Sequence, residues 1–177
     1  MGRLEEAFYH RECLEVARDL VGKVLVRKTP AGELRLRISE TEGYCGEADT
    51  ACHASKGRTK RTEVLYAPSG TIYVYLCYGI HWLINIITGE ENAPQGVLIR
   101  ACVEAPGPGR LTKALGIDGS FNRKSILETE DLWIEDDGFA CQLAAAPRVG
   151  IGYASPEDQA RPWRFILVTD SRTSPGR

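Results

Sequence analysis

Residues 33–46, ELRLRISETEGYCG, begin as an amphipathic β-strand and end with acidic side chains. Apolar and polar residues alternate with a period of two, which places three aliphatic side chains on one face of the strand: Leu34, Leu36 and Ile38. The same alternation, continued along the chain, places Glu40, Glu42 and Tyr44 on this inward face. Carboxylates in such a position are candidates for tuned acid or base chemistry.

Two simpler interpretations of the acidic end stay open on the pattern alone. Either the strand leaves the core at its end, so that its last inward positions are solvated, or Glu40 forms a structural ion pair with one of the many arginines. If the carboxylates are instead buried, they carry a cost, because a carboxylate beside apolar packing is destabilised unless it is paired, hydrogen-bonded or protonated.

The segments before this strand predict a helix and a partner strand. HRECLEVARDLVG, residues 10–22, has apolar residues at helical spacing and is expected to end at Gly22 as its C-terminal cap. KVLVRKT, residues 23–29, is expected to form a hairpin with residues 33–40 through a turn at residues 30–32.

A polar stretch and a second hairpin follow the strand. Residues 45–70 predict a long loop with short helices, and a loop of this length in a compact domain is usually functional or mobile. GTIYVYLCYGIHWLINIITG, residues 70–89, predicts two strands joined by a tight turn at Tyr78 and Gly79. One face of the first of these strands is expected to carry Thr71, Tyr73, Tyr75 and Cys77, whereas Tyr78 is expected near the tip.

Later segments complete the predicted elements. QGVLIRACVE (95–104), DLWIED (131–136) and WRFILV (163–168) predict strands, and GPGRLTKALG (107–116) predicts a short helix that ends in glycine. Strands in hairpins with few long crossover helices are typical of α+β proteins. We therefore expect one domain over residues 1–177, with a mostly antiparallel curved sheet and peripheral helices.

The composition is that of an ordinary soluble protein. Of 177 residues, 43% are hydrophobic and 26% are charged, and no apolar run approaches the 18 residues of a membrane span. The charged start of the chain is unlike a secretory signal, so we expect a cytoplasmic protein, associated with the nucleoid if it is bacterial. The net charge is −2, yet Lys56, Arg58, Lys60 and Arg61 form a run that is either a basic patch or a solvated loop.

Cysteine spacing gives no sign of a metal or disulfide framework. The six cysteines fall at unrelated positions, without a CxxC pair, and are interpreted as reduced core residues. Cys45, Cys52 and His53 lie close in sequence, but a second pair of ligands is missing, so we expect no metal. No redox cofactor is expected either.

Five separated motifs carry a resemblance to a known family. They are ETEGYCGEADTACH (40–53), TIYVYLCYGIHWLIN (71–85), GVLIRA (96–101), GPGRLTKALGI (107–117) and RVGIG (148–152). In this order they resemble the alkyladenine, or 3-methyladenine, DNA glycosylases over roughly residues 14–166. The resemblance implies a monofunctional enzyme of base excision repair that flips an alkylated or deaminated purine out of duplex DNA and hydrolyses its N-glycosidic bond. The expected purines are 3-methyladenine, 7-methylguanine, hypoxanthine and ethenoadenine.

The resemblance assigns roles to residues at the matching positions. Glu42 matches the general base, Arg100 the arginine that holds the nucleophilic water and a phosphate, and the backbone of Val149 is expected to help to position that water. The other matching residues are Tyr44, His53 and Tyr75 as pocket walls, Asn85 as a barrier to normal guanine, and Tyr78 as the wedge that fills the emptied stack. Glu40 is expected to lie deeper and to play a supporting structural role.

Binding to DNA is expected to use two basic segments. They contribute Arg58, Lys60 and Arg61, together with Arg110 and Lys113 near the start of the expected helix. The partner is double-stranded DNA with a damaged purine, bound by a monomer. None of the expected pocket residues is a lysine, so we expect neither a covalent imine nor strand cleavage.

Two departures from the family pattern bear on the expected grip on DNA. Thr62 stands where the family usually has asparagine, and the connection from Arg100 to Gly107 is roughly twenty residues shorter than usual. Either this member has a true deletion or the chain lacks a mobile segment, and the mass of the intact protein distinguishes the two. Two further functions stay open: a non-catalytic protein that binds lesions in DNA, and a hydrolase of free nucleosides.

Overall fold

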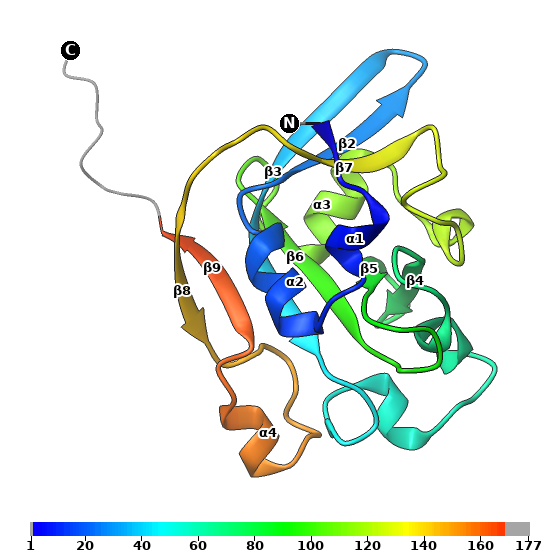
Figure 1. Ribbon diagram of the computed structural model, residues 1–177, viewed down its shortest axis with the longest axis vertical. Coiled ribbons are helices and arrows are strands. Elements are labelled where there is room, and N and C mark those ends of the chain that lie inside the picture. Colours follow the sequence, from blue (N-terminus) through cyan, green and yellow to red (C-terminus); the bar gives the residue numbers. More distant parts are fainter. Residues whose placement is uncertain (1, 169–177) are drawn as a thin grey trace.

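An antiparallel sheet occupies the centre of the computed structural model, which describes residues 2–168 (Figure 1). Its strands are β1 (Gly2–Arg3), β2 (Val24–Thr29), β3 (Gly32–Tyr44), β4 (Ile72–Cys77), β5 (His81–Ile87), β6 (Gly96–Cys102), β7 (Leu132–Asp136), β8 (Gln142–Ala146) and β9 (Arg164–Val168). Their order is β1-β7-β2-β3-β6-β5-β4, and β9 joins β8 to β3. Every strand pair within the described residues is antiparallel, so the predicted α+β class is confirmed.

Helices surround the sheet. They are α1 (Glu6–Tyr9), α2 (Cys13–Leu20), α3 (Pro108–Leu115) and α4 (Pro156–Ala160), with short 3₁₀ helices η1 (His53–Lys56), η2 (Thr62–Tyr66) and η3 (Gly119–Phe121). The predicted helices at α2 and α3 are confirmed, whereas the short helices α1 and α4 and the alanine-rich strand β8 were not predicted. Within residues 2–168 no helix has the length and apolar character needed to cross a bilayer.

The end of α2 differs from the prediction. The helix stops at Leu20, and Val21 is already extended. Gly22 follows with φ +90° and donates its N–H to the carbonyl of Ile38 on β3 at 2.8 Å. Gly22 is therefore not the cap of the helix, and its N–H instead bonds to the neighbouring strand. The end of α3 is as predicted, with Gly116 in the left-handed region at φ +61°.

The first half of β3 lies in a hairpin with β2 that extends from the body of the molecule (Figure 1). Leu34 near its tip is 43% exposed, Leu36 is partly buried, and only Ile38 is fully buried. The prediction that Leu34 faces the core is therefore wrong. The alternation of side chains is present, but no other segment of the described chain packs over this end of the hairpin to bury Leu34.

The second half of β3 lies inside the sheet, between β6 on one side and β9 on the other. Thr41 faces α2, because its hydroxyl donates to the carbonyl of Ala17 at 2.6 Å. Gly43 faces α2 as well, since a Cβ at this position would lie 2.7 Å from Leu14 Cδ2. Glu42, between them in sequence, therefore points to the opposite face of the sheet.

This division separates the core from a second, aromatic face. The core side carries apolar residues of β4, β5 and β6 that belong to the same buried cluster as those of α2, namely Ile72, Val74, Ile84, Ile86, Val97 and Ile99. The alternate positions on β4 carry Tyr73 and Tyr75, as predicted, and the partner of Tyr73 on β5 is Asn85. We call this side, opposite α2, the pocket face.

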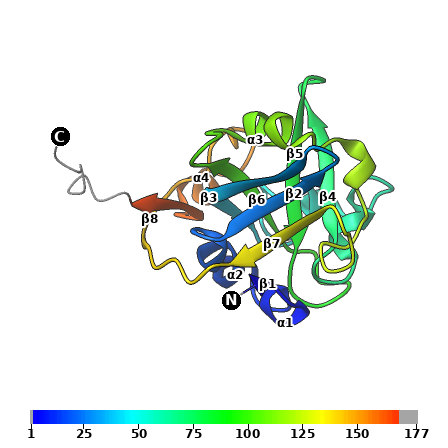
Figure 2. The same ribbon diagram turned by 90° about the horizontal axis from the view of Figure 1, so that it is seen from above.

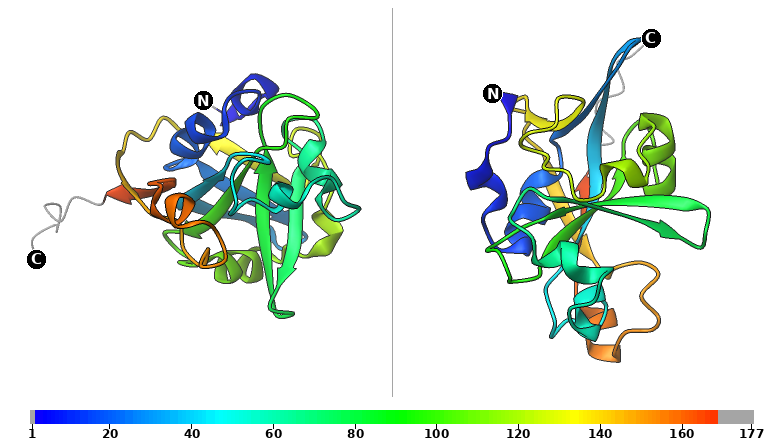
Figure 3. Two further views of the ribbon diagram at one scale, coloured as in Figure 1. Left: turned by 90° about the horizontal axis from the view of Figure 1, so that it is seen from below. Right: turned by 90° about the vertical axis from the view of Figure 1, so that its right-hand side faces the viewer.

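The hairpin of β4 and β5 ends in a three-residue loop, residues 78–80, closed by the pairing of Cys77 with His81. Tyr78 has a positive φ of 53° and is 87% exposed, and Ile80 is 72% exposed. Figures 2 and 3 show this tip projecting from the body, away from α1 and α2. The predicted position of Tyr78 at the tip is confirmed.

Candidate active site

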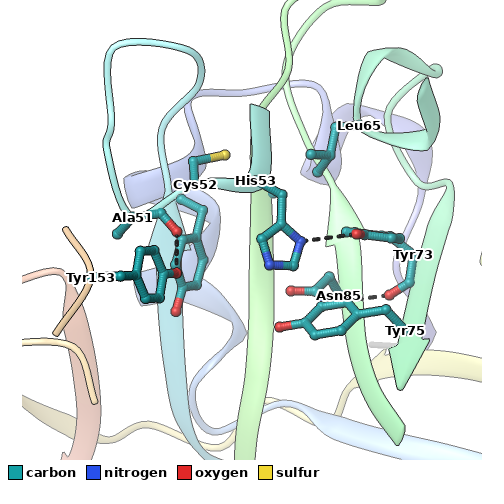
Figure 4. Close-up of a pocket in the computed structure, with 10 residues that line it drawn as sticks. Ala51, Cys52, His53, Leu65, Tyr73, Tyr75, Asn85 and Tyr153 are labelled. Carbon is teal, nitrogen blue, oxygen red and sulfur yellow. Dashed lines mark hydrogen bonds between the residues drawn. The ribbon is translucent and has the colours of Figure 1, made fainter. Parts of the chain in front are cut away.

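A cleft of about 820 Å³ opens on the pocket face. It brings together segments that are far apart in sequence and nine of the predicted site residues, namely Glu42, Tyr44, His53, Arg61, Tyr75, Tyr78, Arg100, Arg110 and Val149. A smaller recess shares Tyr44, His53, Tyr75 and Tyr153 with the cleft and adds Tyr73 and Asn85 (Figure 4). The sheet provides its floor, and the loops after β3 and β8 provide its sides.

Glu42 lies at the bottom of the cleft and is completely buried. Its Oε2 accepts a hydrogen bond from the Val149 N–H at 2.7 Å, and its Oε1 accepts one from the Tyr44 hydroxyl at 3.0 Å. The Arg100 Nη1 lies 3.6 Å from Oε1. The carboxylate thus has a hydrogen-bond donor at each oxygen and a positive charge beside it, which is what a buried carboxylate needs.

The surroundings of Glu42 act on its pKa in opposite directions. Burial raises the pKa most, whereas the Val149 N–H, the charge of Arg100 and the Tyr44 hydroxyl lower it, and the balance leaves the pKa of Glu42 above its ordinary value. A carboxylate with a raised pKa is a stronger base than an exposed one. Glu42 is therefore chemically suited to accept a proton from a bound water.

Glu40 lies nearer to the surface than predicted. Its side chain is 26% exposed, and its Oε2 lies 3.3 Å from Arg164 Nη1 and 3.9 Å from Arg100 Nε. The prediction that Glu40 is the deeper of the two carboxylates is wrong, because the pairing of β3 with β6 is irregular at this residue. The ion-pair interpretation fits Glu40, and the solvated-end interpretation does not fit Glu42.

Aromatic rings form the walls. The rings of His53 and Tyr75 lie 4.8 Å apart at 64°, and those of Tyr73 and Tyr75 lie 5.2 Å apart. A hydrogen bond of 2.9 Å joins His53 Nδ1 to the Tyr73 hydroxyl. Burial, followed by the charges of Arg61 and Lys56, lowers the pKa of His53 to about 4, so the imidazole is neutral at physiological pH.

Tyr153 is a wall residue that the sequence did not single out. In Figure 4 it lies across from Tyr73 and Tyr75, with His53 between, and its hydroxyl donates to the Ala51 carbonyl at 2.7 Å. It follows the RVGIG motif directly, which was the only available signal. Asn85 lines the recess as well, 6% exposed, and its Nδ2 donates to the Tyr73 carbonyl at 3.2 Å.

The predicted basic residues divide into two groups. Arg61 and Arg110 line the cleft, and the Arg61 guanidinium lies 5.5 Å from the centroid of the Tyr75 ring. Arg58 lies outside it, stacked 4.9 Å over Tyr66 and bonded to Asn92. Lys60 and Lys113 are exposed and also lie outside the cleft.

An ion pair behind the cleft was likewise not foreseen. Arg148 and Asp49 are both buried, and the two guanidinium nitrogens of Arg148 donate to the two carboxylate oxygens of Asp49 at 2.6 and 2.9 Å. Both residues stand inside motifs quoted above. Sequence reasoning missed them because nothing in either motif indicates that the two side chains meet.

The six cysteines are free. Three of them, Cys13, Cys52 and Cys102, are buried, as expected for core residues. Within the part of the chain that the structure describes, no three side chains of the His, Cys, Asp or Glu type are arranged to hold a metal ion.

The short connection after β6 is a closed turn. Cys102 and Ala105 exchange backbone hydrogen bonds of 3.1 and 3.2 Å, and Val103 donates to the Arg37 carbonyl at 2.8 Å. The chain therefore passes from β6 to α3 through a short hydrogen-bonded turn.

Known proteins are similar to this chain over most of its length. The model of the family described as methylpurine-DNA glycosylase (MPG) matches residues 7–105 and 103–171, two segments that meet at this same turn. Three curated relatives share the printed name "Putative 3-methyladenine DNA glycosylase". The relative from Methanocella arvoryzae is 43% identical over 92% of this chain and 90% of its own. Those from Nitrosococcus oceani and Psychrobacter cryohalolentis are 41% and 39% identical, each over 93% of this chain and over 89% and 91% of their own. Because the family model and these relatives cover most of its length, this chain belongs to the methylpurine-DNA glycosylase family.

Proposed function

We propose that this protein is a monofunctional DNA glycosylase of base excision repair, which removes alkylated or deaminated purines from double-stranded DNA. The observation that carries the proposal is the position of Glu42, fully buried below an aromatic cleft, with donors on both oxygens and Arg100 at 3.6 Å. The curated relatives bear the name of this activity.

Base flipping is the first step. A base stacked in a duplex cannot reach a buried carboxylate, and extruding it costs a few kcal/mol, least for damaged or mispaired bases. Tyr78, on a projecting tip beside the cleft, is suited to occupy the emptied stack. Arg61 and Arg110 at the rim carry positive charge toward the flanking phosphates.

The extruded purine then enters the aromatic walls. Stacking of a base on an aromatic side chain contributes about 1–3 kcal/mol in single-strand binders, and Tyr44, His53 and Tyr75 offer several such rings. A neutral His53 suits an electron-poor alkylated base better than a cation would. Asn85 on the wall of the recess is placed to exclude the exocyclic amine of guanine.

Hydrolysis follows at the floor. Breaking the N-glycosidic bond builds positive charge on the sugar, which the Glu42 carboxylate stabilises, and the same carboxylate takes a proton from the attacking water. Arg100 is proposed to hold that water and a phosphate. The residues that line the cleft in the described chain include no lysine, so water is the nucleophile and no strand cleavage follows.

The test is a labelled duplex with one hypoxanthine or one ethenoadenine, incubated with the protein and treated with alkali. Wild-type protein is expected to give a break at the lesion, whereas Glu42→Gln binds the lesion without breaking the strand. Binding without a break by the wild type would favour a non-catalytic lesion-binding protein. Faster release of base from free nucleosides than from duplex would favour a nucleoside hydrolase.

A further inference from the structure

The buried pair of Asp49 and Arg148 lies directly behind Glu42 and has no role in the proposed mechanism so far. Their side chains are 1% and 0% exposed. Asp49 accepts hydrogen bonds from the two terminal nitrogens of the Arg148 guanidinium. It also accepts hydrogen bonds from the backbone N–H groups of Cys45 and Ala51, at 3.0 and 3.1 Å. Each carboxylate oxygen of Asp49 thus accepts two hydrogen bonds, and the two bonds from Arg148 fix the plane of its guanidinium.

Arg148 in turn joins three segments of the chain. Its Nη1 donates to the Gly43 carbonyl at 3.0 Å, next to Glu42 on β3, and its Nη2 lies 3.4 Å from the Asp158 carbonyl. The guanidinium packs 4.9 Å from the Tyr44 ring and 4.8 Å from the Trp163 ring. A planar group with five donors can make these contacts together, whereas an ammonium group cannot.

The residue that follows Arg148 is the one that binds Glu42. Because the Val149 N–H lies one peptide bond from the anchored Cα, the position of the arginine sets the 2.7 Å bond from Val149 to Glu42 Oε2. We propose that Arg148, oriented by Asp49, is a positioning residue that keeps this N–H on the Glu42 carboxylate. The proposal rests on the function proposed above for Glu42.

Several other titratable or charged groups lie near Glu42 and influence how its protonation depends on pH. They are Tyr44 on its own strand, Arg100 on β6, Tyr75 on β4, Arg148 and Tyr153 on the loop after β8, and Glu40 and Arg164 around Arg100. Arg148→Lys removes the planar guanidinium donors and so changes the hydrogen bonding of the loop. Because lysine keeps the positive charge, the charges around Glu42 change little.

The experiment measures single-turnover excision by Arg148→Lys across pH. Misplacement of a catalytic group by about 1 Å costs on the order of 10²-fold in rate, and we expect a loss of about that size with unchanged lesion binding. Loss of a donor to a carboxylate raises its pKa. The acidic limb of the profile is therefore expected to move to higher pH, and a carboxyl NMR titration of Glu42 is expected to move in the same direction.

The matched control is Arg37→Lys. Arg37 also binds an aspartate with both nitrogens, Asp137 at 3.1 and 2.6 Å, donates to the Gly22 carbonyl, and stacks on Phe139, but it lies on the β2–β3 hairpin outside the cleft. It is expected to leave the pH profile unchanged. A pH profile and Glu42 titration that are unmoved in Arg148→Lys, with only a smaller folded fraction, would overturn the proposal.

A second variant covers the case in which Arg148→Lys fails to fold. Asp49→Asn leaves Arg148 in place with its bond to the Gly43 carbonyl, and is expected to change rate and titration in the same direction as Arg148→Lys. Wild-type protein that excises no lesion would refute the proposed function, while the Glu42 titration would still test the positioning role. Active wild type with an unmoved titration in Asp49→Asn would refute the positioning role alone.

Discussion

Glu42→Gln is expected to raise or maintain stability while it removes activity. The pKa of Glu42 is raised on folding, so the folded state binds the proton more tightly than the unfolded state does. Wild-type stability therefore falls as the pH rises through the ordinary glutamate pKa toward the raised value. Glutamine carries no charge at any pH and avoids this loss.

The hydrogen bonds of the site can survive the substitution. The glutamine oxygen can accept the Val149 N–H at the position of Oε2, and its amide can donate to the Tyr44 hydroxyl, whose hydrogen rotates away. Arg100 keeps Glu40 as a partner at 3.9 Å. Loss of a general base typically costs 10²–10⁴-fold in rate, or about 3–5 kcal/mol of barrier.

The assay combines thermal unfolding at pH 5 and pH 8 with single-turnover excision. The quantity of interest is the melting temperature of Glu42→Gln minus that of wild type. This difference is expected to be more positive at pH 8 than at pH 5, because at pH 5 the wild-type carboxyl is closer to neutral. Glu40→Gln is the matched control, since its side chain is partly exposed, and it should lose far less activity. A variant clearly less stable than wild type at pH 8 would refute the reasoning, because it would mean that the pair with Arg100 is net stabilising.

Three further outcomes are expected. Tyr78→Ala should slow excision from a paired lesion more than from an unpaired one, and equal losses on the two substrates would contradict a wedge. The His53 imidazole should titrate near pH 4 by NMR, so that its contribution to stability is present above pH 6.5 and lost as the pH falls toward 4; a transition near 6.5 would show that it is solvated. Gly43→Ala should lower the free energy of unfolding by no more than about 1 kcal/mol, since its Cβ would lie 2.7 Å from Leu14 Cδ2, the end of a partly buried side chain that can move aside, and a much larger loss in denaturant unfolding would refute that estimate.

Local pattern predicted much of the fold. The hairpins of β2 with β3 and of β4 with β5, the helices α2 and α3, and the exposed tip at Tyr78 all follow from periodicity and turn residues that are close in sequence. The motifs also named most of the residues that line the cleft. The helices α1 and α4 escaped because they carry too few residues to form a period, and β8 because its sequence QLAAA has no β-branched or aromatic residue.

The sequence by itself determined the antiparallel hairpins and the alternation that turns Glu42 and Tyr44 to one face. Only the tertiary structure decided that Glu42 is buried while Glu40 is not, that Arg61 reaches the cleft while Arg58 stacks on Tyr66, and that Arg148 meets Asp49. The physical reason is that alternation depends on neighbours in the chain, whereas burial, ion pairing and pKa depend on segments more than a hundred residues away that pack against the strand.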